Sequence, residues 1–205
     1  MLSTKRHRYP VVSILIALLI AACLAASPIQ NKALYTEAGL LIADKSEVSI
    51  NRQTGLRMYQ DKVFTGEARQ YHSNGFIATA EQFLNGKRHG FWRTWASSGL
   101  QSLDAAYQNN RLEGTKRTWW DNGQLRSKNE YVDGVMQGLS SMWYRSGALF
   151  KRMNYVDGIE YGLQQAWREN GKLYANYEAR NGRIFGLKKA NLCYGLEDEI
   201  VTLSN

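Results

Sequence analysis

Cationic and aromatic side chains are interspersed over the middle of the chain, between residues 92 and 168. Arginine and tryptophan are enriched where proteins bind one another, because each offers a large contact area together with hydrogen-bond donors. Adjacent residues of a strand face opposite sides of a sheet, so these side chains cannot all share one face. We predict a partner-binding surface here, the alternative being a solvated polar face. The candidate residues are Arg93, Lys116, Arg117, Trp120, Arg126 and Lys128.

Motifs of common active sites are missing from the sequence. It contains no Gly-x-Ser-x-Gly, no Gly-x-x-x-x-Gly-Lys, no His-Glu-x-x-His and no Cys-x-x-Cys. His72 and His89 lack a matched carboxylate spacing, and we interpret them as surface or turn-flanking residues rather than as catalytic groups or metal ligands. We therefore predict no catalytic residue, no cofactor and no enzymatic activity.

Asp133 and Asp157 could suggest cation sites, because calcium-binding repeats also place aspartate in turns. The equivalent positions of other repeats hold Asn85, Asn109 and Asn181, and no second carboxylate recurs nearby. A preference for turn-forming residues explains all five positions at once. We predict no metal site.

These residues sit on a 24-residue repeat that runs without insertion or deletion from Tyr59 to Glu178, with a fading copy at Gly186. Each copy has two turn dipeptides such as Asn122-Gly123 and Asp133-Gly134, which supply the positive φ angles of tight hairpins. A single hairpin cannot bury its apolar face, so neighbouring copies must stack. The sequence predicts an all-β fold, an elongated open array of about six antiparallel hairpins. One glycine recurs in each copy, followed five residues later by an aromatic residue: Gly66, Gly90, Gly114, Gly138 and Gly162, with Tyr71, Trp95, Trp119, Trp143 and Trp167.

Strand alternation gives expectations for individual side chains. We expect Leu125, Ser127 and Asn129 on one face, and Arg126 and Lys128 on the other. The recurring aromatic residues should pack between successive hairpins as a ladder. Gly90 and its equivalents should be bulge or close-approach positions.

The N-terminus has the features of an export signal. Lys5, Arg6 and Arg8 precede an apolar run that is too short to span a membrane, and Ile20-Ala21-Ala22-Cys23 closes it. We predict a signal over 1–22, a lipid-modified Cys23 and a tether over 23–46 with a short helix near 34–43. The alternative is ordinary cleavage near Ala25 or Ala26, without lipid.

The remaining boundaries follow from the repeat. We expect the repeat domain over 47–190 and a C-terminal cap over 191–205, in which Cys193 is either a small buried residue or a reactive thiol. The formal net charge of +8 falls to +5 once the three cations of the signal are removed, an excess that permits an anionic partner without demanding one. Export argues against nucleic acid as the partner.

Written out as Tyr-Val-Asp-Gly-x-x-x-Gly-x-x-x-x-Trp-Tyr-x-x-Gly from Tyr131 to Gly147, the repeat resembles the bacterial variant of the MORN repeat. The stretch from Thr54 to Gly66 is similar to the entry motif that often precedes the first such repeat. The chain departs from the pattern at Asn110, where other copies have glycine, and at Asn191, where they have tryptophan. The second departure favours a terminal cap.

The resemblance implies an architecture rather than a site. Families built on it include antitoxin or immunity proteins, and membrane-associated scaffolds that bind lipid or protein. Together with the export signal, it suggests an envelope-anchored immunity protein on the periplasmic side, held by Cys23 in the outer membrane because Leu24 is not an aspartate. Its expected partner is a toxic effector, such as a phospholipase of a contact-dependent or type VI secretion system. The alternative is a structural or lipid-binding scaffold at the outer membrane. The sequence leaves the oligomeric state open.

Overall fold

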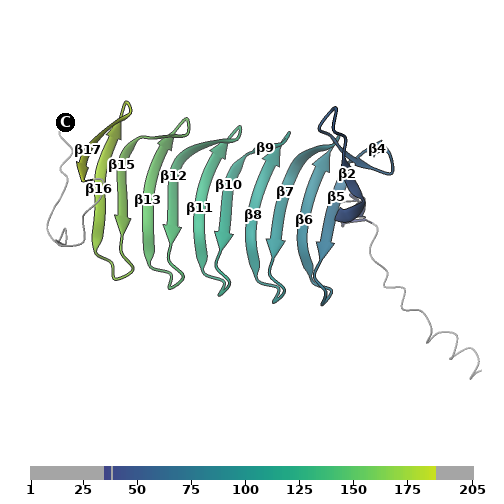
Figure 1. The fold of residues 1–205 in the computed structure, drawn as a ribbon, viewed down its shortest axis with the longest axis horizontal. Helices are drawn as coiled ribbons and strands as arrows, with labels where there is room; N and C mark the ends of the chain where they lie inside the picture. Colours follow the sequence, from purple (N-terminus) through teal and green to yellow (C-terminus); the bar gives the residue numbers. More distant parts are fainter. Residues whose placement is uncertain (1–34, 38, 188–205) are drawn as a thin grey trace, which may run out of the picture. The chain divides into compact units, whose positions relative to one another are not determined.

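The computed structural model describes residues 35–37 and 39–187, which form strands and one short 3-10 turn, η1 (Lys45–Glu47) (Figure 1). The strands before the regular repeats are β1 (Ile42–Asp44), β2 (Val48–Ile50), β3 (Arg57–Tyr59) and β4 (Lys62–Val63). The repeats contain β5 (Gly66–Tyr71), β6 (Ile77–Leu84), β7 (Lys87–Trp95), β8 (Gln101–Gln108), β9 (Arg111–Leu112), β10 (Gly114–Trp119), β11 (Leu125–Val132), β12 (Val135–Trp143), β13 (Leu149–Val156), β14 (Ile159–Glu160), β15 (Gly162–Trp167), β16 (Leu173–Arg180) and β17 (Arg183–Leu187).

Within the described residues, 14 strands form one sheet whose order follows the chain from β5 to β17. Every pairing in it is antiparallel except the parallel pair β1–β5, and β9 and β14 are short segments that pair with β8 and β13. Strands β2, β3 and β4 form a separate small sheet. Figure 1 shows the hairpins following one another along the sheet. The predicted all-β array of antiparallel hairpin repeats is confirmed.

The two turn dipeptides of each repeat give its hairpins their geometry. At one end of the strands both central residues have positive φ, as in Asn85 (50°) and Gly86 (74°), which is the geometry of a type I′ turn. Asn110 adopts φ 70° at the glycine position, which asparagine tolerates better than other side chains. Asp133 and Asp157 occupy the same turn position with φ near 52° and 51°. Their recurrence is therefore explained by turn geometry.

A β-bulge in each repeat changes which side chains share a face. On β10 and β11, Thr118 pairs with Ser127 while Trp119 pairs with Leu125, so Arg126 is left opposite no partner. The same shift occurs between β12 and β13, where it leaves Phe150 unpaired. The expectation that Leu125 lies with Ser127 and Arg126 with Lys128 is therefore wrong. One extra residue reverses the alternation on one side of the bulge.

Side chains tie each repeat to the next through backbone carbonyls. Trp120 Nε1 donates to the carbonyl of Trp143 at 3.0 Å, and Tyr144 Oη donates to that of Trp167 at 2.9 Å. His72 Nε2 makes the equivalent contact with the Trp95 carbonyl, which identifies it as a structural turn residue. These hydrogen bonds fix the spacing of successive repeats.

The tightest packing lies near the start of the array, where Phe64 (2% exposed) contacts the ring of Phe83. The recurring Trp95, Trp119 and Trp143 are half-buried. The recurring glycines have positive φ: 95° at Gly90 and 74° at Gly114. Side chains larger than hydrogen are disfavoured there for this reason.

The segment before the repeats differs from expectation. Instead of a helix near 34–43, its described residues form a bridge between Tyr35 and Leu41 and then β1, which pairs with β5. Backbone hydrogen bonding to the sheet edge, such as Glu67 N to the Leu41 carbonyl at 2.8 Å, replaces helical bonding. The predicted signal, Cys23, Cys193 and the cap lie outside the described residues. No helix in the described part of the chain is long and apolar enough to cross a membrane.

Candidate binding surfaces on the two faces of the sheet

Strand register divides the six predicted interface residues into two groups. On β10 and β11, Lys116 pairs with Asn129 and Arg117 pairs with Lys128. Directly paired residues share a face and adjacent residues do not. Arg93, Arg117 and Lys128 lie on one side, which we call the row face. Lys116 lies on the other, which we call the hollow face.

A hollow of about 370 Å³ opens on the hollow face over β10 to β13. It brings together the other three predicted residues, Lys116, Trp120 and Arg126. The remaining lining residues are Thr118, Ser127, Asn129, Met142, Trp143 and Phe150. The bulge is what allows this meeting, because it turns Arg126 away from Lys128.

Two aromatic contacts hold the walls of the hollow. The indole of Trp120 is oriented by its hydrogen bond to the Trp143 carbonyl, and the guanidinium of Arg126 lies 4.6 Å from the Trp120 ring centroid. One repeat further on, the Phe150 ring packs against Tyr144 with centroids 4.9 Å apart. Such contacts restrict the rotamers of the wall residues, so little ordering remains for a ligand to impose.

The two cations of the hollow lack acidic partners. Within the described residues, neither Lys116 nor Arg126 forms an ion pair, and no carboxylate lines the hollow. The floor of the hollow carries two hydroxyl groups, of Thr118 and Ser127, which form a hydrogen bond with each other at 2.7 Å. Two uncompensated charges beside aromatic rings favour an anionic ligand with an apolar body.

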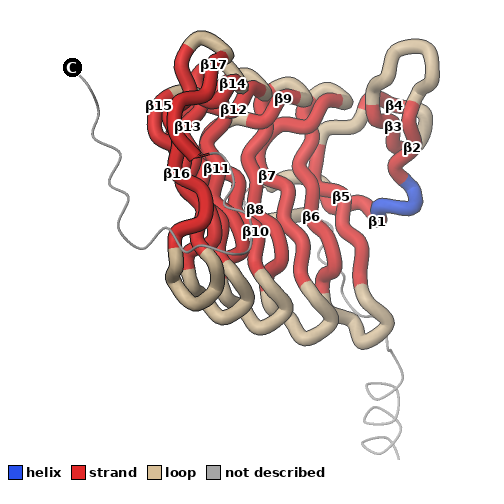
Figure 2. Tube along the Cα trace, turned by 60° about the vertical axis from the view of Figure 1, so that its left-hand side comes forward, coloured by secondary structure: helices blue, strands red, loops and turns tan. Residues whose placement is uncertain are grey.

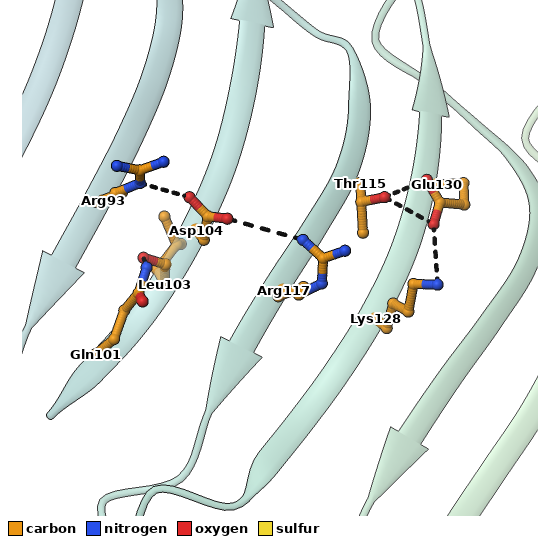
Figure 3. Close-up of polar contacts among 8 residues, drawn as sticks. All are labelled: Arg93, Gln101, Leu103, Asp104, Thr115, Arg117, Lys128 and Glu130. Carbon is orange, nitrogen blue, oxygen red and sulfur yellow. Dashed lines mark hydrogen bonds and ion pairs between the residues drawn. The ribbon is translucent and has the colours of Figure 1, made fainter.

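The row face carries its cations in a line across successive strands. Asp104 lies between two of them, 2.9 Å from Arg93 Nε and 3.8 Å from Arg117 Nη1 (Figure 3). Lys128 reaches Glu130 at 3.5 Å, and Glu130 also accepts from the Thr115 hydroxyl (Figure 3). Two carboxylates thus compensate three cations here. The direct pairing of Arg117 with Lys128 places like charges opposite each other.

The row continues beyond Lys128. Lys128 pairs with Ser141, which pairs with the exposed Arg152. Arg152 forms no ion pair among the residues that the structure describes. The row face therefore has a cationic excess toward the later repeats.

A second hollow of about 320 Å³ lies over β13 to β16 and was not predicted. Tyr177 donates a hydrogen bond to Glu160 at 2.9 Å inside it, and the fully buried Gln164 lines it as well. Burial, together with the bond to Glu160, raises the pKa of Tyr177. Glu160 occupies a repeat position held by Arg88, Leu112 and Met136 elsewhere, so no recurring pattern indicated this pocket.

The acidic turn residues are engaged in surface contacts. Asp133 pairs with Arg111 of β9, and the hydrogen bond from Arg111 lowers the pKa of Asp133. Asp157 accepts from Gln137 Nε2 at 2.6 Å. No group of three or more His, Cys, Asp or Glu side chains gathers as a metal site within 35–37 and 39–187.

Comparison with known families gives one match. The model of the MORN repeat variant matches residues 112–133, from the end of β9 through β10 and β11 to the next turn. This segment contains five of the six candidate residues, all except Arg93. No curated protein matches the chain.

Proposed function

We propose that this protein is a non-enzymatic immunity or antitoxin protein, which neutralises a toxic effector by binding it in the cell envelope. The observation that carries the proposal is the hollow face, where Lys116, Trp120 and Arg126 converge on one preformed site. Arginine and tryptophan are the residue types that most often dominate binding energy at protein interfaces. The resemblance to repeat families that contain antitoxins supports the same reading.

Neutralisation by occlusion needs only a complementary and rigid surface. Each repeat is fixed to its neighbour by side-chain bonds such as Tyr144 Oη to the Trp167 carbonyl. A partner therefore meets a surface that loses little conformational freedom on binding. The effector we favour is a secreted phospholipase delivered by a contact-dependent or type VI system, because such enzymes attack from the compartment to which the signal would send this chain.

The cellular placement is part of the proposal. The N-terminal sequence supports export and lipid attachment at Cys23, which would hold the protein at the periplasmic face of the outer membrane. A membrane-attached inhibitor meets a membrane-attacking enzyme at the surface where that enzyme acts.

The test is protection of cells against a candidate effector, a secreted phospholipase taken from a gene neighbouring that of this protein. Cells carrying the wild-type protein should survive induction of the effector in the periplasm. Cells carrying Lys116→Glu/Arg126→Glu should not, while Arg117→Glu/Lys128→Glu, matched in charge change and neighbouring in sequence, should still protect. Export and folding are checked by fractionation and circular dichroism. Full protection by the hollow-face variant, or a lack of protection by the wild type, overturns the proposal.

One observation favours a second candidate, a lipid-binding scaffold at the outer membrane. Trp95 and Trp119 follow Arg93 and Arg117 by two residues in the same strands, β7 and β10. Cations beside tryptophans suit an interface with anionic headgroups. Under this alternative, Arg117→Glu/Lys128→Glu would reduce binding to vesicles of anionic lipid, and the hollow-face variant would bind them as wild type does.

A further inference from the structure

We infer that the hollow bounded by Trp120, Arg126 and Phe150 is a receptor site for an aromatic carboxylate, presented by the partner as a ring with a carboxylate attached or adjacent in sequence. The inference rests on the proposed function and deepens it, since it states what the effector must display. The chemistry fits two presentations: a C-terminal aromatic residue with its free carboxylate, or an aromatic residue beside an aspartate or glutamate.

The walls of the hollow select for a planar apolar group. Phe150 and Met142 line it from β13 and β12, and Trp120 lines it from the end of β10. Aromatic rings pack favourably edge to face or offset against other rings, and methionine adapts to the remaining contour. The volume of about 370 Å³ lies at the small end of ligand pockets, which suits one large side chain rather than a whole helix.

The cations of the hollow select for a negative charge on that group. Lys116 and Arg126 belong to strands β10 and β11, so they approach the same opening from neighbouring strands. Arg126 is exposed, and its guanidinium carbon lies 4.6 Å from the Trp120 ring centroid. A guanidinium can donate two parallel hydrogen bonds, the arrangement that a carboxylate accepts best. Since no acidic side chain lines the hollow, a negative group of the ligand would meet these two cations without a competing carboxylate.

The second hollow differs from the first in containing a carboxylate. It lies over β13 to β16 on the same face, and there Glu160 contributes a carboxylate that accepts a hydrogen bond from Tyr177. An anionic ligand meets an acidic group in that hollow and none in the first. The first hollow is therefore the place where an aromatic anion is recognised.

The experiment uses small probes on the folded, lipid-free chain lacking residues 1–23, observed by ¹H–¹⁵N NMR. The reporter is the indole N–H of Trp120, assigned by its absence in Trp120→Phe. The probes are N-acetyl-phenylalanine, its amide and acetate, followed by the peptides Ac-Gly-Ser-Gly-Phe and Ac-Gly-Asp-Phe-Gly-amide. The titrations are run at neutral pH, where every carboxyl group of the probes is ionised.

N-acetyl-phenylalanine should shift the Trp120 signal in a saturable way, with a roughly millimolar Kd for so small a probe. Its amide and acetate should bind at least about tenfold more weakly, because each lacks one of the two recognised groups. Lys116→Gln or Arg126→Gln should weaken binding by about tenfold, whereas Arg117→Gln and Lys128→Gln on the row face should leave the Kd unchanged. At least one peptide should bind as well as the free acid.

Equal binding of the amide overturns recognition of the carboxylate, and equal binding of acetate overturns recognition of the ring. Binding of the free acid with neither peptide overturns presentation by a protein partner. If no probe binds while the hollow-face charge reversal abolishes protection, this inference fails and the proposed function stands. If probes bind as expected while the wild type gives no protection, the proposed function fails and the site remains.

Discussion

Lys116 and Arg117 are consecutive cations whose side chains lie on opposite faces of one sheet, Lys116 paired with Asn129 and Arg117 with Lys128. Both belong to β10, one of the strands that run side by side through the array (Figure 2). The pair gives a natural control within two residues. The same charge reversal at either position changes the charge of this stretch of sequence equally. Only the face of the sheet that loses the cation differs.

Single charge reversals at this pair should separate the two faces. We expect Lys116→Glu to weaken binding of the neutralised effector by at least about tenfold, because it places a carboxylate beside the ligand's negative group. Arg117→Glu should change the affinity by less than about threefold. Isothermal titration calorimetry of each purified variant with the purified effector measures both affinities. Equal losses at the two positions would show that the hollow face is not the binding face.

Asp104 compensates two arginines, so its removal should destabilise the array. In Asp104→Asn, Arg93 and Arg117 lose their shared carboxylate, and Arg117 still faces Lys128. Asp104 is only 25% exposed, and we expect the free energy of unfolding to fall by about 1 kcal/mol, with much of the loss recovered in high salt. Urea unfolding at low and high salt measures this. The control is Asp121→Asn, whose partner Arg145 lies on the exposed surface and whose loss should cost a few tenths of a kcal/mol.

Two equivalent glycines should differ in their sensitivity to alanine. Gly114 has φ 74° and open space around its missing Cβ, so Gly114→Ala should cost about 1 kcal/mol of conformational strain. At Gly90, with φ 95°, a Cβ would also clash with Gln82 Oε1, which accepts a hydrogen bond from Phe91 N. We expect Gly90→Ala to cost about 2 to 3 kcal/mol in urea unfolding. The same cost at both sites would mean that Gln82 moves aside freely.

Alkaline pH should destabilise the array through its half-buried tyrosines. Burial raises the pKa of Tyr107, Tyr131 and Tyr155 above the ordinary value of 10.0. A raised pKa in the folded state means that the stabilisation is fully present below the unfolded pKa and is lost as pH rises through the folded pKa. The urea midpoint should therefore fall above about pH 10.

The variant Tyr155→Phe tests the tyrosine contribution directly. It keeps the ring and removes one ionisation, so its midpoint should fall less steeply than that of the wild type as the pH rises above about 10. All other side chains are common to the two proteins, so the difference in slope is due to Tyr155. Parallel slopes for the two proteins would contradict the prediction.

Much of the fold was predictable because the sequence repeats at a constant interval. Each 24-residue copy carries its own turn residues, such as Asn122-Gly123, so local chemistry alone specifies two strands per copy. Agreement among the copies makes the inference far stronger than any single hairpin allows. The pairing of β1 with β5 was not predictable, because 42–44 lacks the repeat and its pairing depends on a parallel partner distant in sequence.

The candidate site was predictable in composition but not in arrangement. Strict alternation places Arg126 beside Lys128, and only the bulge, an irregularity with no distinctive residue of its own, moves Arg126 into the hollow with Lys116. The second hollow depends on Glu160 and Tyr177, which are 17 residues apart and meet through strand pairing. Neither residue belongs to a pattern that marks it in the sequence.

The side-chain bonds between repeats join residues 23 positions apart, as from Trp120 to Trp143, so each copy is attached only to its neighbours. Duplication or loss of one whole copy in frame would leave every other junction intact. Each such event would move the hollow by two strand spacings, about 10 Å, relative to the N-terminal end of the array. The distance at which a partner is captured can thus evolve in discrete steps, without any redesign of the surface that captures it.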